Sequence, residues 1–563
     1  MSSAHAIPQT QHAVQLTGRG ELRLNRAKPV PRPGPTQILA RVEATGLCFS
    51  DLKLLRQFAS HARKAPIVSG LAPEILAGIP SYVPDDKPTV PGHETVCRIV
   101  AVGDRARRHR VGERCLVQSD YRMLRTAESN AAFGYNFEGG LQEYVLMDER
   151  VVIDPQTDQR YLIPVGEELA AAALCLVEPW ACVEDSYVSP ERRTIRAGGK
   201  LLVVADPDHE VAGLAEAFAC EGKPASATAV CRTPSQSGAL RKLGIPLDEC
   251  DSVQSLPEAG FDDVVYFGVT AQTIELLNDR LAPRGIMNVV TGGRRIGRRV
   301  SIDVGRVHYG RCRWVGTFDL EAHHAYRTIP AGGELRPQER VLIIGAGGPM
   351  GQMHVIRDLC AGVPGLSITA ADLDEARLES LRARTAELAR TAGVSLHLVN
   401  PATEPDASGR FSYFVLTAPV AALVAEAIDR SLPDAVINIF AGIPAGTRHP
   451  LDLDTYIERH GFMLGTSGSV IRDMEIVLAK VQGGRLDTNR SVDAVSGMAG
   501  AIEGMSAVEN RTLSGKIIVY PQLHDLGLVP LAELSRRLPS VAAKLRDGCW
   551  SRDAEEELLR VAH

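Results

Sequence analysis

Three residues of different types, Cys48, His93 and Glu94, could together bind a metal ion. Cys48 stands in the string GLCFSD, and His93 and Glu94 end the string PGHE. A thiolate, an imidazole and a carboxylate suit a borderline-soft cation, and a site with few protein ligands keeps a position open for water or a substrate oxygen. These residues predict a catalytic metal centre.

A glycine-rich run, GAGGPMG at 345–351, predicts a dinucleotide site. It follows the apolar segment 341–344 and precedes the helix-like segment 352–360, and a pyrophosphate needs this order of strand, turn and helix. The spacing is one residue longer than the usual fingerprint. We expect the cofactor to contact Gly345, Gly347, Gly348, Met350 and Gly351. A metal beside a dinucleotide indicates metal-assisted hydride transfer.

The next apolar segment, 366–371, ends at Asp372. A carboxylate at this position can accept hydrogen bonds from both ribose hydroxyls of NAD and would repel the 2′-phosphate of NADP. Arg377 follows closely and could accommodate that phosphate, so NADP stays open. We expect NAD.

The elements that must position these residues fall into two patterns. Up to about residue 190, short apolar runs broken by Gly and Pro predict a small β-barrel. From about 198 to 480, strands alternate with helices, which is typical of parallel sheets with crossover helices. Within the second pattern the segment 261–317 is repeated, with the same order of motifs, about 150 positions later in the chain.

The first copy differs from the second in its first turn. Its opening strand, 200–204, is followed by the acidic segment 205–210, ADPDHE, which has no glycine. Acidic side chains would repel a pyrophosphate and the backbone could not approach it closely. We interpret this copy as a dinucleotide-type fold without its phosphate loop. It is either a structural or dimerisation module or a second ligand site.

Composition excludes several classes of protein. A formal net charge of −6 argues against a nucleic-acid partner. No segment reaches the roughly 18 apolar residues of a membrane span, and the N-terminus does not have the pattern of a signal peptide, so we expect a cytoplasmic protein. The 11 cysteines include no Cys-x-x-Cys pair, which argues against a disulfide scaffold.

Taken together, the motifs resemble those of the zinc-dependent medium-chain dehydrogenase/reductase superfamily, of the alcohol and polyol dehydrogenase type and nearest to sorbose-1-phosphate reductase-like members. The resemblance covers roughly 1–190 and 336–520 and rests on 46–53, 91–94, 139–144, 178–179, 345–354, 465–474 and 515–519. It implies an α/β protein with a GroES-like β-barrel catalytic domain, here with two tandem Rossmann-like doubly wound domains. We expect a GroES-like zinc domain at 1–190, a degenerate Rossmann-like domain at 191–335 and an NAD-binding Rossmann domain at 336–480. The remaining segment, 481–563, would return to the catalytic domain and end in a helical extension.

The same resemblance assigns roles to single residues. It implies that Cys48 and His93 bind Zn²⁺, and that Glu94 and Glu178 are acidic residues beside the metal, of which one or both are ligands. It gives Ser50 the role of accepting the substrate proton. Lys53 stands where many relatives carry His, so the onward proton path runs through Lys53 or through solvent. Arg472 would reach the pyrophosphate.

Two departures from the family pattern are visible. The segment 57–87 is an insertion between the two ligand motifs. Its cations are either solvated loop charges or bind a phosphate or carboxylate of the substrate. The stretch 118–133 has no cysteine where many relatives have four, so we expect one zinc per chain.

The sequence thus predicts a zinc-dependent oxidoreductase that transfers a hydride between NAD(H) and a secondary alcohol or ketone of a polyol, sugar or sugar phosphate. One alternative is an epimerase or lyase in which tightly bound NAD gives no net redox change. A second is a non-catalytic nucleotide sensor or assembly subunit. We expect a small-molecule substrate, no nucleic-acid or membrane partner, and a homo-oligomer, either a dimer or a tetramer.

Overall fold

The computed structural model describes residues 7–404 and 409–562 of the chain. The chain divides into two compact units, Met1–Glu184 with Gly468–His563, and Asp185–Ser467. Each unit combines strands and helices, as expected for an α/β protein. Among the described residues, none of the helices has both the length and the apolar character to cross a membrane.

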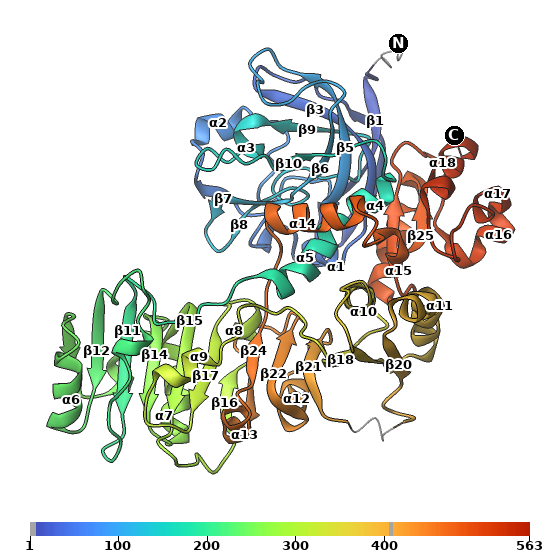
Figure 1. Ribbon diagram of the computed structural model, residues 1–563. Coiled ribbons are helices and arrows are strands. Elements are labelled where there is room, and N and C mark those ends of the chain that lie inside the picture. Colours follow the sequence, from blue (N-terminus) through green and yellow to red (C-terminus); the bar gives the residue numbers. More distant parts are fainter. Residues whose placement is uncertain (1–6, 405–408, 563) are drawn as a thin grey trace. The chain divides into compact units, whose positions relative to one another are not determined.

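The first unit is built around an eight-stranded sheet, to which both ends of the chain contribute strands (Figure 1). Its path is β10-β6-β5-β3-β26-β25-β27, and β9 also pairs with β3. The strands are β3 (Gln37–Gly46), β5 (Glu94–Val102), β6 (Arg114–Val117), β9 (Tyr144–Asp148), β10 (Leu162–Pro164), β25 (Val492–Ser496), β26 (Lys516–Val519) and β27 (Val529–Pro530). The chain therefore returns from the second unit to complete the sheet that it began.

Smaller elements surround this sheet. A hairpin, β1 (Thr10–Gly18) with β2 (Glu21–Pro29), and a three-stranded sheet, β4 (Ile67–Ser69), β7 (Asp120–Thr126) and β8 (Asn130–Ala132), belong to the same unit. Its main helices are α1 (Phe49–Gln57), α4 (Ala171–Cys175), α14 (Ile471–Gln482), α15 (Ala501–Asn510) and α18 (Arg552–Val561), and α5 (Val177–Val188) leads into the second unit. The expected insertion contributes β4 and the short helix α2 (Pro73–Ala77).

The second unit contains two six-stranded parallel sheets with the same order of strands. The first runs β13-β12-β11-β14-β15-β17 and the second β20-β19-β18-β21-β22-β24. The first consists of β11 (Lys200–Ala205), β12 (Ser226–Val230), β13 (Leu247–Glu249), β14 (Phe261–Phe267), β15 (Leu281–Val290) and β17 (Arg313–Thr317). The second consists of β18 (Arg340–Ile344), β19 (Ser367–Ala371), β20 (Ser395–Val399), β21 (Phe411–Leu416), β22 (Ser431–Ile439) and β24 (Phe462–Leu464).

The helices of the two copies differ at the point where the sequences differ. In the second copy, β18 leads into α10 (Pro349–Leu359), whereas in the first copy β11 leads into a loop and the single turn η2 (Ala215–Ala217). The other helices of the second copy are α11 (Glu375–Ala392), α12 (Ala422–Asp429) and α13 (Leu453–Glu458), and those of the first are α6 (Pro234–Arg241), α7 (Ala271–Leu277), α8 (Gly305–His308) and α9 (His323–Arg327). The helix that would begin at a pyrophosphate is thus replaced by a loop at 206–214.

The two copies are joined by a symmetric strand pair. Strand β16 (Val300–Asp303) of the first copy pairs in antiparallel register with β23 (Arg448–Leu451) of the second. Val300 lies opposite Leu451, and Ile302 opposite His449, so each copy uses the corresponding positions of its own strand. This is the pattern of an isologous two-fold interface, here formed within one chain.

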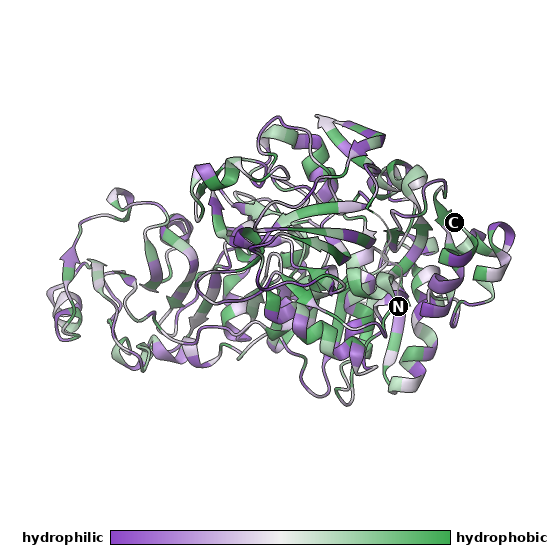
Figure 2. Ribbon diagram, turned by 90° about the horizontal axis from the view of Figure 1, so that it is seen from above, coloured by the Kyte–Doolittle hydropathy of each residue, from purple (hydrophilic) through white to green (hydrophobic). Residues whose placement is uncertain are grey.

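One apolar core runs through both copies. It includes Tyr266 and Trp314 from the first sheet and Phe414 and Ile437 from the second, each no more than 2% exposed. Hydrophobic residues are concentrated in the strands, and hydrophilic residues in many of the loops that connect them (Figure 2). The buried strand runs seen in the sequence therefore pack as expected for parallel sheets covered on both faces.

Candidate active site

Cys48, His93 and Glu94 come together because two strands of the first unit pair. Gly46 at the end of β3 lies opposite Glu94 at the start of β5. Cys48 follows β3 as the N-cap residue of α1, and His93 directly precedes β5. Ligand atoms of the three side chains all lie within 4.8 Å of one another. The structure thus gathers three of the four residues for which the sequence predicts a role at the metal.

Asp51, in the first turn of α1, organises this cluster. One carboxylate oxygen lies 3.1 Å from His93 Nδ1 and accepts a hydrogen bond from the backbone N–H of Gly92 over 3.3 Å. The other oxygen accepts from the backbone N–H of Cys48 over 3.1 Å. Burial opposes the imidazolium form of His93, but the Asp51 carboxylate raises the pKa of His93 well above its usual value. A carboxylate that holds the second nitrogen of a metal-binding His fixes its tautomer and orientation.

Sequence reasoning missed this role of Asp51. The residue lies inside the GLCFSD string, three positions after Cys48. This spacing between an N-cap residue and an acidic residue at N3 is that of a capping box, and it could have indicated the interaction.

Glu94 is fully buried, and only one of its two carboxylate oxygens forms a hydrogen bond among the described residues. Its Oε1 accepts a hydrogen bond from Lys516 Nζ over 2.5 Å, whereas its Oε2 has no hydrogen-bond partner among the described residues. A Cβ at Gly46 would lie 2.1 Å from this Oε2, so the glycine lets the carboxylate approach the β3 backbone. Burial opposes the charge of Lys516, but the Glu94 carboxylate outweighs it and raises the pKa of Lys516. Lys516 was part of a recognised strand motif, but it had no predicted role.

Glu178 lies in the first turn of α5, outside the group of three ligand atoms but beside it. The pKa of Glu178 is raised to about 7, mainly by burial and also by the nearby Glu94 carboxylate, against the opposing positive charges of His93, Lys516 and Arg63. A carboxyl with a pKa near neutrality can hold or release a proton at the edge of the cluster.

The two residues with predicted roles in proton transfer differ in their surroundings. Ser50 is half-buried, and its Oγ accepts from the Cys48 thiol over 3.6 Å. Lys53 is exposed on α1. The hydroxyl is therefore beside the cluster, and the amine is in contact with solvent.

The insertion lies close to the cluster through Tyr135. The His61 ring lies 5.1 Å from the Tyr135 ring and the Arg63 guanidinium 5.7 Å, while Tyr135 lies 5.9 Å from the His93 ring. Burial, together with the charges of Arg63 and Lys53, lowers the pKa of His61 to about 4, so this imidazole is neutral at pH 7. Arg63 also forms an ion pair with Asp120 over 3.2 Å.

Other charged residues of the insertion have different surroundings. Lys64 is buried and donates to the carbonyl oxygens of Val83 and Lys87, so it links two parts of the insertion. Asp85 and Asp86 are exposed.

In the second unit, the glycine run forms a tight turn between β18 and α10. Gly345 has a φ of +81°, which favours glycine. A Cβ at Gly351 would lie 2.2 Å from the Gly345 carbonyl oxygen, and one at Gly347 would lie 2.6 Å from Cβ of Arg377. Gly348 is the N-cap residue of α10, and Met350 is half-buried in its first turn. The backbone is therefore open for close approach of a phosphate at the N-terminus of an 11-residue helix.

Asp372 follows β19 and supports this turn. Its Oδ2 accepts a hydrogen bond from the backbone N–H of Gly347 over 2.9 Å, and its Oδ1 accepts from that of Asp374 over 3.1 Å. A carboxylate has about four acceptor positions, so two remain for ribose hydroxyls. Arg377 Nε lies 3.5 Å from Asp374 Oδ2.

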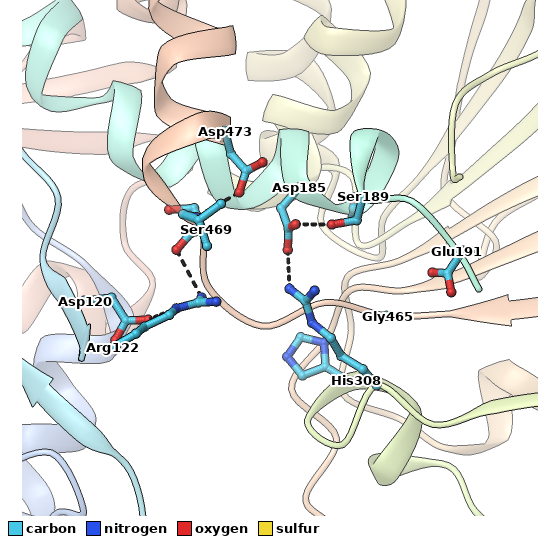
Figure 3. A network of polar contacts seen from close by, with 12 residues as sticks. Asp120, Arg122, Asp185, Ser189, Glu191, His308, Gly465, Ser469 and Asp473 are labelled. Atoms are coloured by element: carbon cyan, nitrogen blue, oxygen red, sulfur yellow. Dashed lines mark hydrogen bonds and ion pairs between the residues drawn. The ribbon is translucent and has the colours of Figure 1, made fainter. Parts of the chain in front are cut away.

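Arg472 is exposed in the first turn of α14, which belongs to the first unit. The start of this helix is held firmly, because Arg122 donates to the carbonyl oxygen of Ser469 over 3.1 Å and to Asp120 over 2.8 Å (Figure 3). The Asp473 carboxylate accepts from the backbone N–H of Val470 over 2.8 Å. The predicted contact of Arg472 with the pyrophosphate stays a prediction.

The residues present fit both groups that the sequence predicts. A thiol, an imidazole and a carboxylate with one unpartnered buried oxygen form a donor set that suits zinc. The glycines of the turn at 345–351 leave open the space that side chains would otherwise fill, and a pyrophosphate requires this space to approach the backbone. In the first copy, the corresponding segment after β11 has neither the glycines nor the helix.

Comparison with known proteins agrees with this reading of the fold. Residues 34–156 match the family model of the alcohol dehydrogenase GroES-like domain. L-sorbose 1-phosphate reductase of Klebsiella pneumoniae is 27% identical over 352 residues, which cover 55% of this chain and 75% of that protein. The zinc-type alcohol dehydrogenase-like protein YphC of Escherichia coli is 29% identical over 161 residues, 26% of this chain and 40% of that protein.

Among solved structures, 2R,3R-butanediol dehydrogenase of Bacillus subtilis matches with a TM-score of 0.51 and 15% identity, over 91% of this chain and all of that one. At this identity the match shows the fold alone. The expected fold class, a GroES-like domain with Rossmann-like parallel sheets, is confirmed.

Proposed function

We propose that the chain, which resembles the medium-chain dehydrogenase/reductase superfamily, is a zinc-dependent oxidoreductase that transfers a hydride between NAD(H) and a secondary alcohol or ketone. The substrate would be a polyol, a sugar or a sugar phosphate. The observation that carries the proposal is the group Cys48, His93 and Glu94. Asp51 orients the His93 ring, and one carboxylate oxygen of Glu94 has no hydrogen-bond partner among the described residues.

The residues of the chain have separate tasks in this reaction. Cys48, His93 and Glu94 would hold the zinc, with Glu178 beside them as an alternative or additional ligand. Asp51 keeps the His93 ring oriented, and Lys516 balances the charge of Glu94. When bound, the metal lowers the pKa of the substrate hydroxyl. The Ser50 hydroxyl, beside Cys48, would receive the proton and pass it to solvent or towards Lys53.

The cofactor has its own set of residues. Bound NAD supplies the hydride acceptor. The turn of Gly345, Gly347, Gly348, Met350 and Gly351 would receive the pyrophosphate, and Asp372 the ribose hydroxyls. Asp372 favours NAD over NADP through repulsion of a 2′-phosphate.

The class of substrate rests on two supports. A relative with 27% identity is a sugar-phosphate reductase by name. In this chain, Arg63 and Lys53 put positive charge near His61, which is linked to the cluster through Tyr135. These cations would attract an anionic group on the substrate.

The test is the Cys48→Ser variant of the full chain. We expect wild-type protein to bind zinc and NADH and to oxidise members of a polyol and sugar-phosphate panel. The variant should lose turnover by at least about 1,000-fold, because the metal contributes several kcal/mol to the reaction. It should keep NADH binding, measured by nicotinamide fluorescence. Unchanged turnover in Cys48→Ser would refute the metal assignment, and NAD that copurifies without released NADH would favour an epimerase or lyase.

A further inference from the structure

A second group of metal-ligand side chains lies in the first copy, at the carboxyl ends of its parallel strands. The segment after β17, DLEAHH at 319–324, contains Glu321, His323 and His324. Ligand atoms of these three residues lie within 4.8 Å of one another. Asp319 adds a second carboxylate, with Oδ2 2.7 Å from His324 Nδ1. This edge of the sheet is the counterpart of the edge where the second copy has its glycine turn.

The Nδ1 atoms of both histidines lie near carboxylates but form no hydrogen bond among the described residues. His323 is only 6% exposed, yet its Nδ1 has no hydrogen-bond partner among the described residues. The same holds for Nδ1 of His324 within the described part of the chain. Glu321 Oε2 lies 3.2 Å from His323 Nδ1, but without hydrogen-bond geometry. A buried polar atom without a hydrogen bond destabilises the folded state, and a bound cation would offset this cost.

A nearby histidine provides an internal comparison. His209, on the loop after β11, lies 3.0 Å from the Thr291 carbonyl oxygen through Nε2 and 3.2 Å from Asp208 through Nδ1. Both of its ring nitrogens are thus used by the protein. It lines a separate small cavity of about 90 Å³ with Leu320 and Arg294. The unsatisfied nitrogens are therefore a property of His323 and His324, and not of every histidine at this edge.

Hydrogen bonds hold the backbone where the loop after β17 leads into α9. The N–H of Ala322 donates to the Ala212 carbonyl oxygen over 3.1 Å, and the Asn288 side chain donates to the Ala322 carbonyl oxygen over 2.9 Å. Gly213 packs so closely on Glu321 that a Cβ there would lie 2.7 Å from the Glu321 Cβ. The backbone of the ligand residues is therefore held in place before any ion binds, which lowers the entropic cost of binding.

We propose that Glu321, His323 and His324 form a divalent transition-metal site, with zinc as the best match. Two imidazoles and a carboxylate are a usual ligand set for zinc, and Asp319 or water would complete the coordination. Glu321 is half exposed and His323 is buried, so the site is partly open to solvent. The first copy, which lacks a phosphate loop, would thus bind a metal ion at the edge where its counterpart binds a nucleotide. The full chain would bind two zinc ions instead of the one expected from the sequence.

The experiment counts metal in four forms of the full-length protein after dialysis at buffered micromolar free zinc. We expect about two zinc per chain in the wild type, one in Cys48→Ser, one in His323→Gln and none in the double variant. The matched control is His397→Gln, because His397 is exposed on β20 of the other copy and should leave two zinc bound. With cobalt in place of zinc, the thiolate-to-cobalt absorption band should persist in His323→Gln and disappear in Cys48→Ser.

The outcomes separate the two proposals. If the wild type binds one zinc and Cys48→Ser binds none, the second site is refuted and the proposed function stands. If the one zinc is lost in His323→Gln but kept in Cys48→Ser, the second site stands and the proposed zinc of the oxidoreductase is refuted. Should His323→Gln fail to fold, Glu321→Gln alters a half-exposed side chain and should weaken zinc binding in the Cys48→Ser background by about tenfold or more. An unchanged affinity there would overturn the site.

Discussion

Asp51 is the residue that connects the parts of the proposed zinc site, although it is not itself in the ligand group. It contacts the backbone of Cys48 and of Gly92 and the ring of His93. Substitution Asp51→Asn keeps the size but removes the charge that orients the imidazole. We expect a loss of zinc affinity of about 10- to 100-fold, measured by competition with a chromophoric chelator. The exposed Asp86→Asn is the control, and an Asp51→Asn affinity equal to that of the control would contradict a positioning role.

Glu178 should leave a signature in the pH dependence of stability. Its pKa is raised from 4.5 to about 7, mainly by burial, so the folded metal-free protein holds a proton that the unfolded chain has released. Between about pH 4.5 and 7 the folded state therefore binds more protons, and its stability falls as pH rises through this window. Glu178→Gln should remove this contribution. Urea denaturation of metal-free protein at several pH values measures it, and parallel curves for wild type and variant would show that Glu178 does not titrate there.

The close packing of the turn at 345–351 indicates which glycines the proposed cofactor site needs. Gly351 is the position where a Cβ would meet the Gly345 carbonyl oxygen at 2.2 Å, so Gly351→Ala must displace the turn or the start of α10. Gly238, on α6 of the first copy and outside this turn, is a matched control, because a Cβ there would meet nothing within 4 Å. We expect Gly351→Ala to weaken NADH binding by about tenfold or more and Gly238→Ala to change it little, as measured by fluorescence titration. Equal effects of the two substitutions would argue against the close-approach explanation.

The elements themselves could largely be predicted from the sequence, because their signals are local. The buried runs 200–204 and 341–344, the repeat at an interval of about 150 residues and the loss of glycines at 205–210 all correspond to features of the structure. Pairing between β16 and β23 could not be predicted, since nothing local to either strand specifies a partner almost 150 residues away. The C-terminal segment was expected to end in a helical extension. In the structure, short helices α16 (Leu534–Arg537) and α17 (Pro539–Ala542) precede α18.

The site could be predicted in part for the same reason. Cys48, His93 and Glu94 belong to short strings with recognisable chemistry. The contacts of Asp51 with Gly92 and of Lys516 with Glu94 depend on the pairing of distant strands, so they require the three-dimensional structure. The cluster at 319–324 was missed because two adjacent histidines near carboxylates are common on surfaces. Only the burial of His323 and its unpartnered nitrogen distinguish it.

At the scale of the molecule, the two copies form within one chain an interface of the kind that two subunits could form. The pairing of β16 with β23 follows a two-fold pattern, and β17 packs beside β24. Because these two edges already contact one another, the homo-oligomer that we expect would use another surface. One apolar core spans both copies, so the first copy contributes to the stability of the second.

Because the core is shared, a destabilising substitution in the first copy should also destabilise the second. Ile302 is fully buried in β16, opposite His449 of β23. Replacing it with Ala should cost about 2–5 kcal/mol of unfolding free energy, since the cavity left behind lies at the junction of the copies. Hydrogen exchange measured by mass spectrometry should show protection lost in β15 and in β22 together. Val420→Ala, at a residue that is 50% exposed, should change neither strand. Loss of protection confined to β15 would instead mean that the copies unfold independently and that the first is only attached to the second.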